Sequence, residues 1–98
     1  MEQKTYTPKR INKEQVADMK FPIKEVLKCA SEIRNRGLEL HKAMVLGNSN
    51  KVKFKITFED FEGMKQIETT IWGVTSAYVC LKANALIPVY RIHCIEPF

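Results

Sequence analysis

Residues 51–58 alternate strictly between polar and apolar positions. The apolar set is Val52, Phe54, Ile56 and Phe58, and the polar set is Lys51, Lys53, Lys55 and Thr57. Successive side chains of a strand point to opposite faces, so this pattern predicts one apolar and one basic face. A helix would scatter the four apolar residues around its axis. We therefore expect a strand whose apolar face, including Phe54 and Ile56, lies in the core.

Apolar residues at three- and four-residue spacing predict helices within residues 13–46. Asn12, with Gln15 three positions later, is typical of an N-cap for a short turn that ends at Phe21-Pro22. Pro22 suits the first turn of a second helix, and Gly37 is typical of its end. Its apolar stripe would consist of Ile23, Val26, Leu27, Ala30 and Ile33.

The segment 38–46 permits two interpretations. Its strong helix formers favour a helix with Gly47-Asn48 as C-cap, whereas the shared parity of Leu38, Leu40, Met44 and Leu46 permits a strand. We favour the helix because Val45 is its only β-branched residue.

The rest of the chain predicts a meander of strands. Residues 60–63 form a tight turn in which Gly63 adopts positive φ, and Gly73 marks a bulge or bend. Pro88 indicates an edge strand. The further strands are expected at 65–72, 77–82, 86–89 and 92–96, with a turn at 83–85.

Length and composition indicate one globular domain. The chain has 98 residues, of which 45% are hydrophobic and 28% charged, so a single core serves all of it. The first ten residues predict a flexible basic arm, and residues 11–98 the domain. Since no apolar run reaches the ~20 residues of a membrane span and the N-terminus lacks a signal-peptide pattern, we expect a cytoplasmic protein without membrane contact.

Charge and cysteine usage narrow the chemistry. The net charge of +5 is compatible with a polyanionic partner, and most of the excess lies in residues 1–50. The chain has an odd number of cysteines, and no two of them have Cys-x-x-Cys spacing. This predicts three buried free thiols, at Cys29, Cys80 and Cys94. A zinc site would need His41 or His93 as a further ligand. We therefore expect no cofactor and no metal.

The order of elements resembles the Sm-like small β-barrel over residues 51–98. The chain end Ile87-Pro-Val-Tyr-Arg-Ile-His-Cys-Ile95 is similar to the ends of that class, in which a basic residue and Ile precede a short strand. The nearest similarity is to the Rho-binding antiterminator family, and a more distant one is to the Sm-like bacterial RNA chaperone. The resemblance implies an α+β fold, with N-terminal helices in residues 13–46 packed on a five-stranded antiparallel barrel, Sm-like or SH3-like, in residues 51–96.

Two sets of residues are candidates for nucleic-acid binding. Lys51, Lys53 and Lys55 would lie roughly 7 Å apart along a strand and could contact phosphates, although lysines also protect exposed strands from pairing. Trp72 and Tyr90 could stack on unpaired bases, with Arg91 as a neighbouring cation. For Trp72, we favour burial in the core over exposure.

Catalysis has little support in the sequence. Glu59, Asp60 and Glu62 cluster at one turn, where carboxylates are usually solvated, and neither histidine lies in a nucleophile motif. We expect a non-catalytic regulatory module that binds RNA. The alternative is a protein–protein adaptor for a transcription or translation factor, as the antiterminator resemblance implies. Partner identity and oligomeric state stay open.

Overall fold

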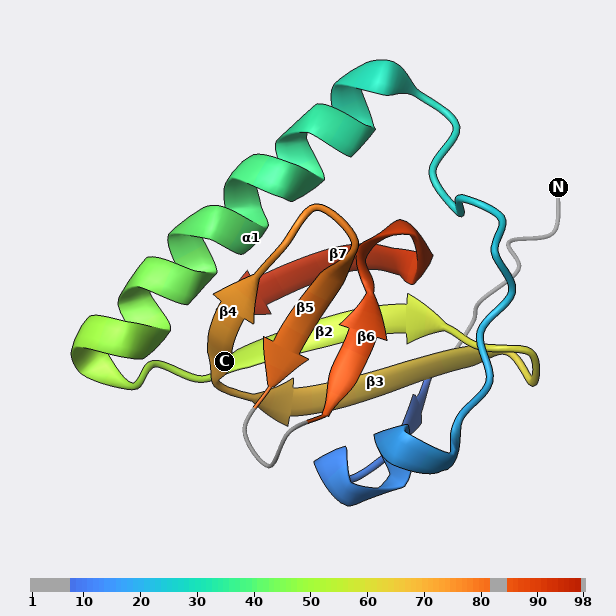
Figure 1. The fold of residues 1–98 in the computed structure, drawn as a ribbon, viewed down its shortest axis with the longest axis horizontal. Helices are drawn as coiled ribbons and strands as arrows, with labels where there is room; N and C mark the ends of the chain where they lie inside the picture. Colours follow the sequence, from blue (N-terminus) through green and yellow to red (C-terminus); the bar gives the residue numbers. More distant parts are fainter. Residues whose placement is uncertain (1–7, 82–84, 98) are drawn as a thin grey trace, which may run out of the picture.

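Two sheets and one long helix make up the fold (Figure 1). The computed structural model describes residues 8–81 and 85–97. The first sheet has the strand order β1-β3-β2-β7, and the second has the order β4-β5-β6. Strand bounds in the first sheet are β1 Lys9–Arg10, β2 Phe54–Glu59, β3 Met64–Thr69 and β7 Ile92–Pro97. Those in the second are β4 Ile71–Val74, β5 Tyr78–Leu81 and β6 Leu86–Pro88.

The chain is α+β, but the predicted five-stranded barrel is wrong. In residues 8–81 and 85–97 neither sheet closes on itself. The chain leaves the first sheet at Thr70, between β3 and β4, and continues in the second. The helix α1 (Ala30–Asn50) packs against β4 and β7, which are edge strands of different sheets. Closure would need such edges to pair with each other, and here the helix covers them instead.

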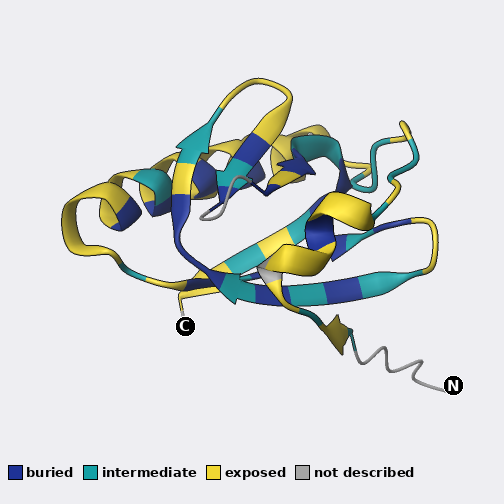
Figure 2. Ribbon diagram, turned by 60° about the horizontal axis from the view of Figure 1, so that its bottom comes forward, coloured by how far each residue is buried: buried dark blue, intermediate teal, exposed yellow. Residues whose placement is uncertain are grey.

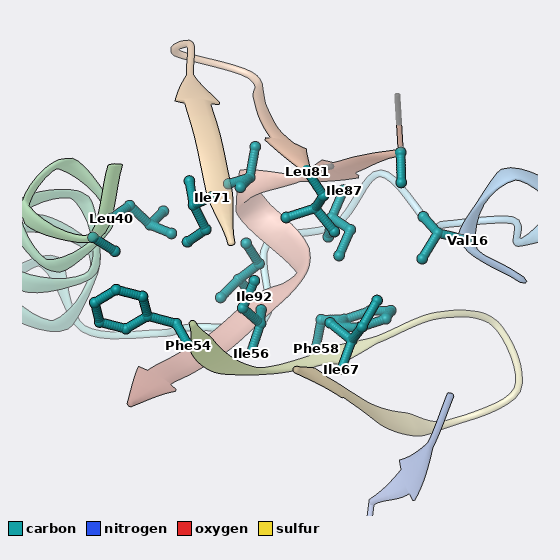
Figure 3. Close-up of a cluster of buried hydrophobic side chains, with 13 residues drawn as sticks. Val16, Leu40, Phe54, Ile56, Phe58, Ile67, Ile71, Leu81, Ile87 and Ile92 are labelled. Carbon is teal, nitrogen blue, oxygen red and sulfur yellow. The ribbon is translucent and has the colours of Figure 1, made fainter. Parts of the chain in front are cut away.

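Strand β2 lies at the centre of the core, as its alternation predicts. Phe54, Ile56 and Phe58 are each at most 5% exposed and point between the sheets (Figure 3). In the register, Ile56 stands opposite Ile67 of β3 and Ile95 of β7. Buried and half-buried positions alternate along β3, whereas Ile56, Thr57 and Phe58 of β2 are all buried (Figure 2). The prediction that Phe54 and Ile56 are core residues is confirmed.

The turn and edge predictions also hold where the structure describes them. Gly63 has φ +137°, and Asp60 Oδ1 accepts hydrogen bonds from the backbone N–H groups of Glu62 and Gly63. Pro88 lies in β6, an edge strand of the second sheet. The β4–β5 register shifts next to Gly73. Residues 83 and 84 of the predicted turn lie outside the described residues.

The N-terminal segment differs from its prediction. Lys9 and Arg10 are not part of a free arm: they form β1, which pairs in parallel with β3. Residues 1–7 lie outside the described residues. The cap at Asn12 is confirmed, because its backbone N–H donates to Gln15 Oε1 at 2.8 Å. The helix that follows, η1 (Lys13–Asp18), is a 3₁₀ helix.

A helix starting at Pro22 is not formed. Backbone groups of this segment bond to distant parts of the chain: the Val26 N–H donates to Tyr90 O, and Lys20 O accepts from the Phe61 N–H. Ile23 is 86% exposed, so the predicted apolar stripe has no common face. Tertiary hydrogen bonds thus replace the i→i−4 bonds that a helix would need.

Helix α1 instead runs through Gly37 and Gly47 without a break. Its buried residues Arg36, Leu40, Ala43 and Gly47 recur at helical spacing on both sides of Gly37. Burial of this face outweighs the ~1 kcal/mol that a helical glycine costs. The helix interpretation of 38–46 is confirmed, but the predicted stops at Gly37 and Gly47 are wrong. No helix in the described residues is both long and apolar enough to cross a membrane.

Alanine substitutions at the two glycines of α1 should change the stability of the protein in opposite directions. A Cβ on Gly47 would lie 2.4 Å from the backbone oxygen of Ile71, whereas a Cβ on Gly37 would meet nothing within 4 Å. Gly47→Ala should therefore destabilise the protein by about 1–3 kcal/mol. Gly37→Ala should stabilise it by about 0.5–1 kcal/mol. Urea unfolding measures both, and equal effects of the two substitutions would contradict the close contact.

The Glu25–Arg36 pair predicts a loss of stability in acid. Two hydrogen bonds of 2.6 and 2.7 Å join the guanidinium to both carboxylate oxygens. The Arg36 hydrogen bonds lower the pKa of Glu25 below its ordinary 4.5, against an opposing effect of burial. A lowered pKa contributes stability above pH 4.5 that is lost as the pH falls through the folded-state pKa.

Glu25→Gln should cost about 1–2 kcal/mol at neutral pH. The difference from wild type should shrink as the pH falls below 4.5 and through the lowered pKa of Glu25, because protonation leaves the wild type and the variant equally uncharged at this position. Urea unfolding across this pH range is the measurement. A difference that stays constant would show that the carboxylate charge contributes nothing.

Candidate nucleic-acid interface

Trp72 is a surface residue, and the prediction that it is buried is wrong. It lies in β4 where the register with β5 shifts between Ile71 and Gly73, so Trp72 has no partner in the ladder. Thr70 and Ile71 are both buried although they are consecutive, which breaks the alternation of the preceding strand. As a result, Ile71 takes the core position and the Trp72 side chain is 56% exposed.

An open cleft of about 270 Å³ brings Trp72 together with two of the predicted lysines. Three segments meet here: the last turn of α1, the residues that follow it, and the β3–β4 junction. Within residues 8–81 and 85–97, no carboxylate lines the cleft. The lining residues are Gly47, Asn48, Lys51, Lys53, Thr70 and Trp72.

Lys51 is held in an unusual backbone conformation at the end of α1. It is the C-cap, with φ 57° and ψ 37°, and its N–H donates to Gly47 O at 3.0 Å. It is the only non-glycine residue with positive φ in the described part of the chain. Glycine or asparagine usually occupies this position, because a Cβ is disfavoured there. The cap turns the chain so that Lys51 and Lys53 both line the cleft.

Lys55 does not line this cleft. It lies within β2, half-buried, and stands opposite Glu68 of β3 and Glu96 of β7 in the strand register. Glu68 in turn forms a 2.5 Å ion pair with Arg10. The outer face of the first sheet therefore carries a row of alternating charge, which we call the mixed-charge row: Arg10, Glu68, Lys55 and Glu96. The three lysines do not form one basic line.

Tyr90 and Arg91 lie away from Trp72. Tyr90 lines a second cleft of about 370 Å³, which shares no residue with the first and also contains Tyr78 and Leu86. Arg91 is only 6% exposed. Its Nε donates to Glu59 O at 3.0 Å and its Nη1 to Lys24 O at 2.6 Å. These bonds join the 21–29 segment to β2, so the guanidinium has a structural role.

Asn48 and Thr70 are cleft residues that the sequence pattern did not indicate. Asn48 falls within α1 and is not its predicted C-cap, and its Nδ2 donates to Trp72 O at 3.4 Å. Thr70 lies where the chain passes from the first sheet to the second, and a Cβ on Gly47 would lie 3.0 Å from the Thr70 methyl carbon. Neither belongs to a local motif, because only the contact of α1 with β4 brings them beside Trp72.

The carboxylates of the 59–62 turn are part of the framework. Asp60 is 5% exposed and accepts from Lys65 Nζ at 3.0 and 3.1 Å. Burial alone would lower the pKa of Lys65, but hydrogen bonds to Asp60 and Glu62 outweigh it and raise the pKa. Glu59 Oε1 lies 2.9 Å from His93 Nε2.

The cysteines are free, but the prediction that all three are buried is wrong. Cys29 and Cys94 are exposed, and Cys80 is half-buried. Cys94 stands opposite Thr57 on the outer face of the first sheet. Within residues 8–81 and 85–97, no three His, Cys, Asp or Glu side chains are grouped so that they could hold a metal ion.

Comparisons with protein-family models, with curated proteins and with solved structures gave no match for this chain. The interface is therefore defined by its own residues. The Sm-like resemblance of residues 51–98 stays a prediction, without the closed barrel that it implied.

Trp72 is the only tryptophan, so its fluorescence reports on the cleft alone. Exposure predicts efficient quenching by small ions. Since Lys51 and Lys53 give the cleft a positive potential, iodide should quench more strongly than caesium at low ionic strength. Lys51→Gln with Lys53→Gln should reduce this difference, and Lys55→Gln should leave it unchanged. Equal quenching by both ions in the wild type would contradict a basic cleft.

Proposed function

We propose that this protein is a non-catalytic module that binds single-stranded RNA through the Trp72 cleft. The observation that carries the proposal is that an exposed tryptophan and two lysines line one cleft, to which the described residues contribute no carboxylate. Binders of single strands combine aromatic stacking platforms with nearby cations in the same way. A cytoplasmic location and a regulatory role stay predictions from the sequence.

The chemistry of each side chain in the cleft suggests its role in RNA binding. The Trp72 indole offers a π face to an unpaired base, which a paired base inside a duplex cannot reach. Lys51 and Lys53 supply ammonium groups for phosphates. Asn48 and Thr70 add polar groups at the base edge. Tyr90, Arg91 and Lys55, which were also candidates, are not part of this proposed site.

Salt dependence tests the phosphate contacts. Two contacts to a single strand should give a slope of log affinity against log salt of about −1.4. Lys51→Gln and Lys53→Gln should each reduce its magnitude by about 0.7, while Lys55→Gln should leave it unchanged. Trp72→Ala should weaken binding by about 1–3 kcal/mol without a comparable loss of stability. An absence of binding by the wild type even at low salt would refute the proposal.

Lys51→Gly separates binding from stability. Glycine relieves the positive-φ conformation at the C-cap, so stability should stay unchanged or rise by up to about 1 kcal/mol. RNA affinity should fall nevertheless, because one phosphate contact is lost. RNA titration and thermal melts of the same sample provide the two readouts. Unchanged affinity would show that Lys51 serves the helix end alone.

The alternative function is a protein–protein adaptor, which needs an apolar docking surface. The apolar helix stripe predicted over residues 23–33 cannot provide this surface, because α1 begins only at Ala30. The second cleft, with Tyr78 and Leu86 both more than 40% exposed, offers an apolar surface instead. This function becomes the leading one if the wild type binds no RNA.

A further inference from the structure

We infer that the Trp72 cleft holds one unpaired nucleotide together with its two flanking phosphates, and does not track a longer strand. This inference rests on the proposed function and specifies its ligand. Strand-tracking folds cover about 4–16 nucleotides, with several stacking platforms along a continuous basic groove. Here the single tryptophan and the placement of the neighbouring charges limit the site.

The size of the cleft fits one base. Its volume of about 270 Å³ falls just below the roughly 300–1,000 Å³ of pockets for drug-sized ligands. Among the residues that the structure describes, Trp72 is its only aromatic lining residue, so one base can be stacked. The other exposed aromatic side chains in the described part of the chain lie elsewhere: Tyr78 lines the second cleft, and Phe61 lies at the β2–β3 turn.

The two lysines match two successive phosphates. Lys51 and Lys53 are two residues apart, so their Cα atoms are separated by at most about 7 Å. Both line the cleft that contains Trp72. A nucleotide stacked on the indole would have one phosphate on each side of it, and each could meet one ammonium group.

The mixed-charge row limits how far the proposed nucleotide site can extend along β2. Beyond Lys53 the next basic residue of the strand is Lys55, which stands between Glu68 and Glu96. Arg10 is already paired with Glu68. A strand extended in this direction would meet two cations and two carboxylates, a row without the net positive charge that further phosphates would need.

Oligonucleotide length tests this inference with the intact chain. Uniform RNA oligomers of three, six and twelve nucleotides are titrated at low salt, following Trp72 fluorescence, and affinities are divided by the number of registers. The corrected affinity should be the same for all three lengths. A tracking site would instead gain about fivefold or more for each further stacked base.

Abasic trinucleotides locate the base. Loss of the middle base should weaken binding about fivefold or more, because only the middle nucleotide has a phosphate on both sides. Loss of either end base should have no such effect. Equal losses at all three positions would overturn the inference.

The outcomes separate the two proposals. Strong binding of the twelve-nucleotide RNA with much weaker corrected binding of the trinucleotide would refute the one-nucleotide site and leave RNA binding in place. An absence of binding at every length would refute the proposed function itself. Glu68→Gln combined with Glu96→Gln should make affinity rise with length, because Lys55 then becomes available. No change in this variant would refute the charge boundary.

Discussion

The contact between the last turn of α1 and the backbone of β4 is the constraint on which the candidate site depends. Gly47 permits it, because any side chain would overlap the Ile71 oxygen. Ile71 faces the core, and the bulge beside it leaves Trp72 outside. The helix then ends at Asn50, and the left-handed cap at Lys51 turns the chain into β2. One close approach thus sets the positions of the tryptophan and of both lysines.

Folding also decides which charges remain available to a partner. Arg36 and Arg91 are buried and bind carboxylate or backbone oxygen atoms, and Lys65 is neutralised by Asp60. Lys55 stands among carboxylates on the outer face of the first sheet. The net charge of +5 therefore overstates the basic surface. Lys51 and Lys53 differ from these residues because no acidic residue in the described part of the chain lines their cleft.

Much of the strand framework was predictable from short-range patterns. The alternation of 51–58 identified Phe54 and Ile56 as core residues, and Gly63 and Pro88 marked a turn and an edge. The candidate site was predicted only in part: Lys51, Lys53 and Trp72 meet in one cleft, but Lys55, Tyr90 and Arg91 lie elsewhere. Spacing along a strand cannot show which carboxylates the neighbouring strands place beside a lysine.

By itself, the sequence determined the features that depend on neighbours a few residues away. These are the apolar face of β2, the 60–63 turn and the helical character of 38–46. Only the tertiary structure decided that α1 continues through Gly37 and that residues 22–29 are not helical. It also decided the exposure of Trp72 and the separation of the two sheets at Thr70. The physical reason is that burial of Leu40 and Ala43, together with hydrogen bonds to distant backbone, outweighs local helix preferences of about 1 kcal/mol per residue.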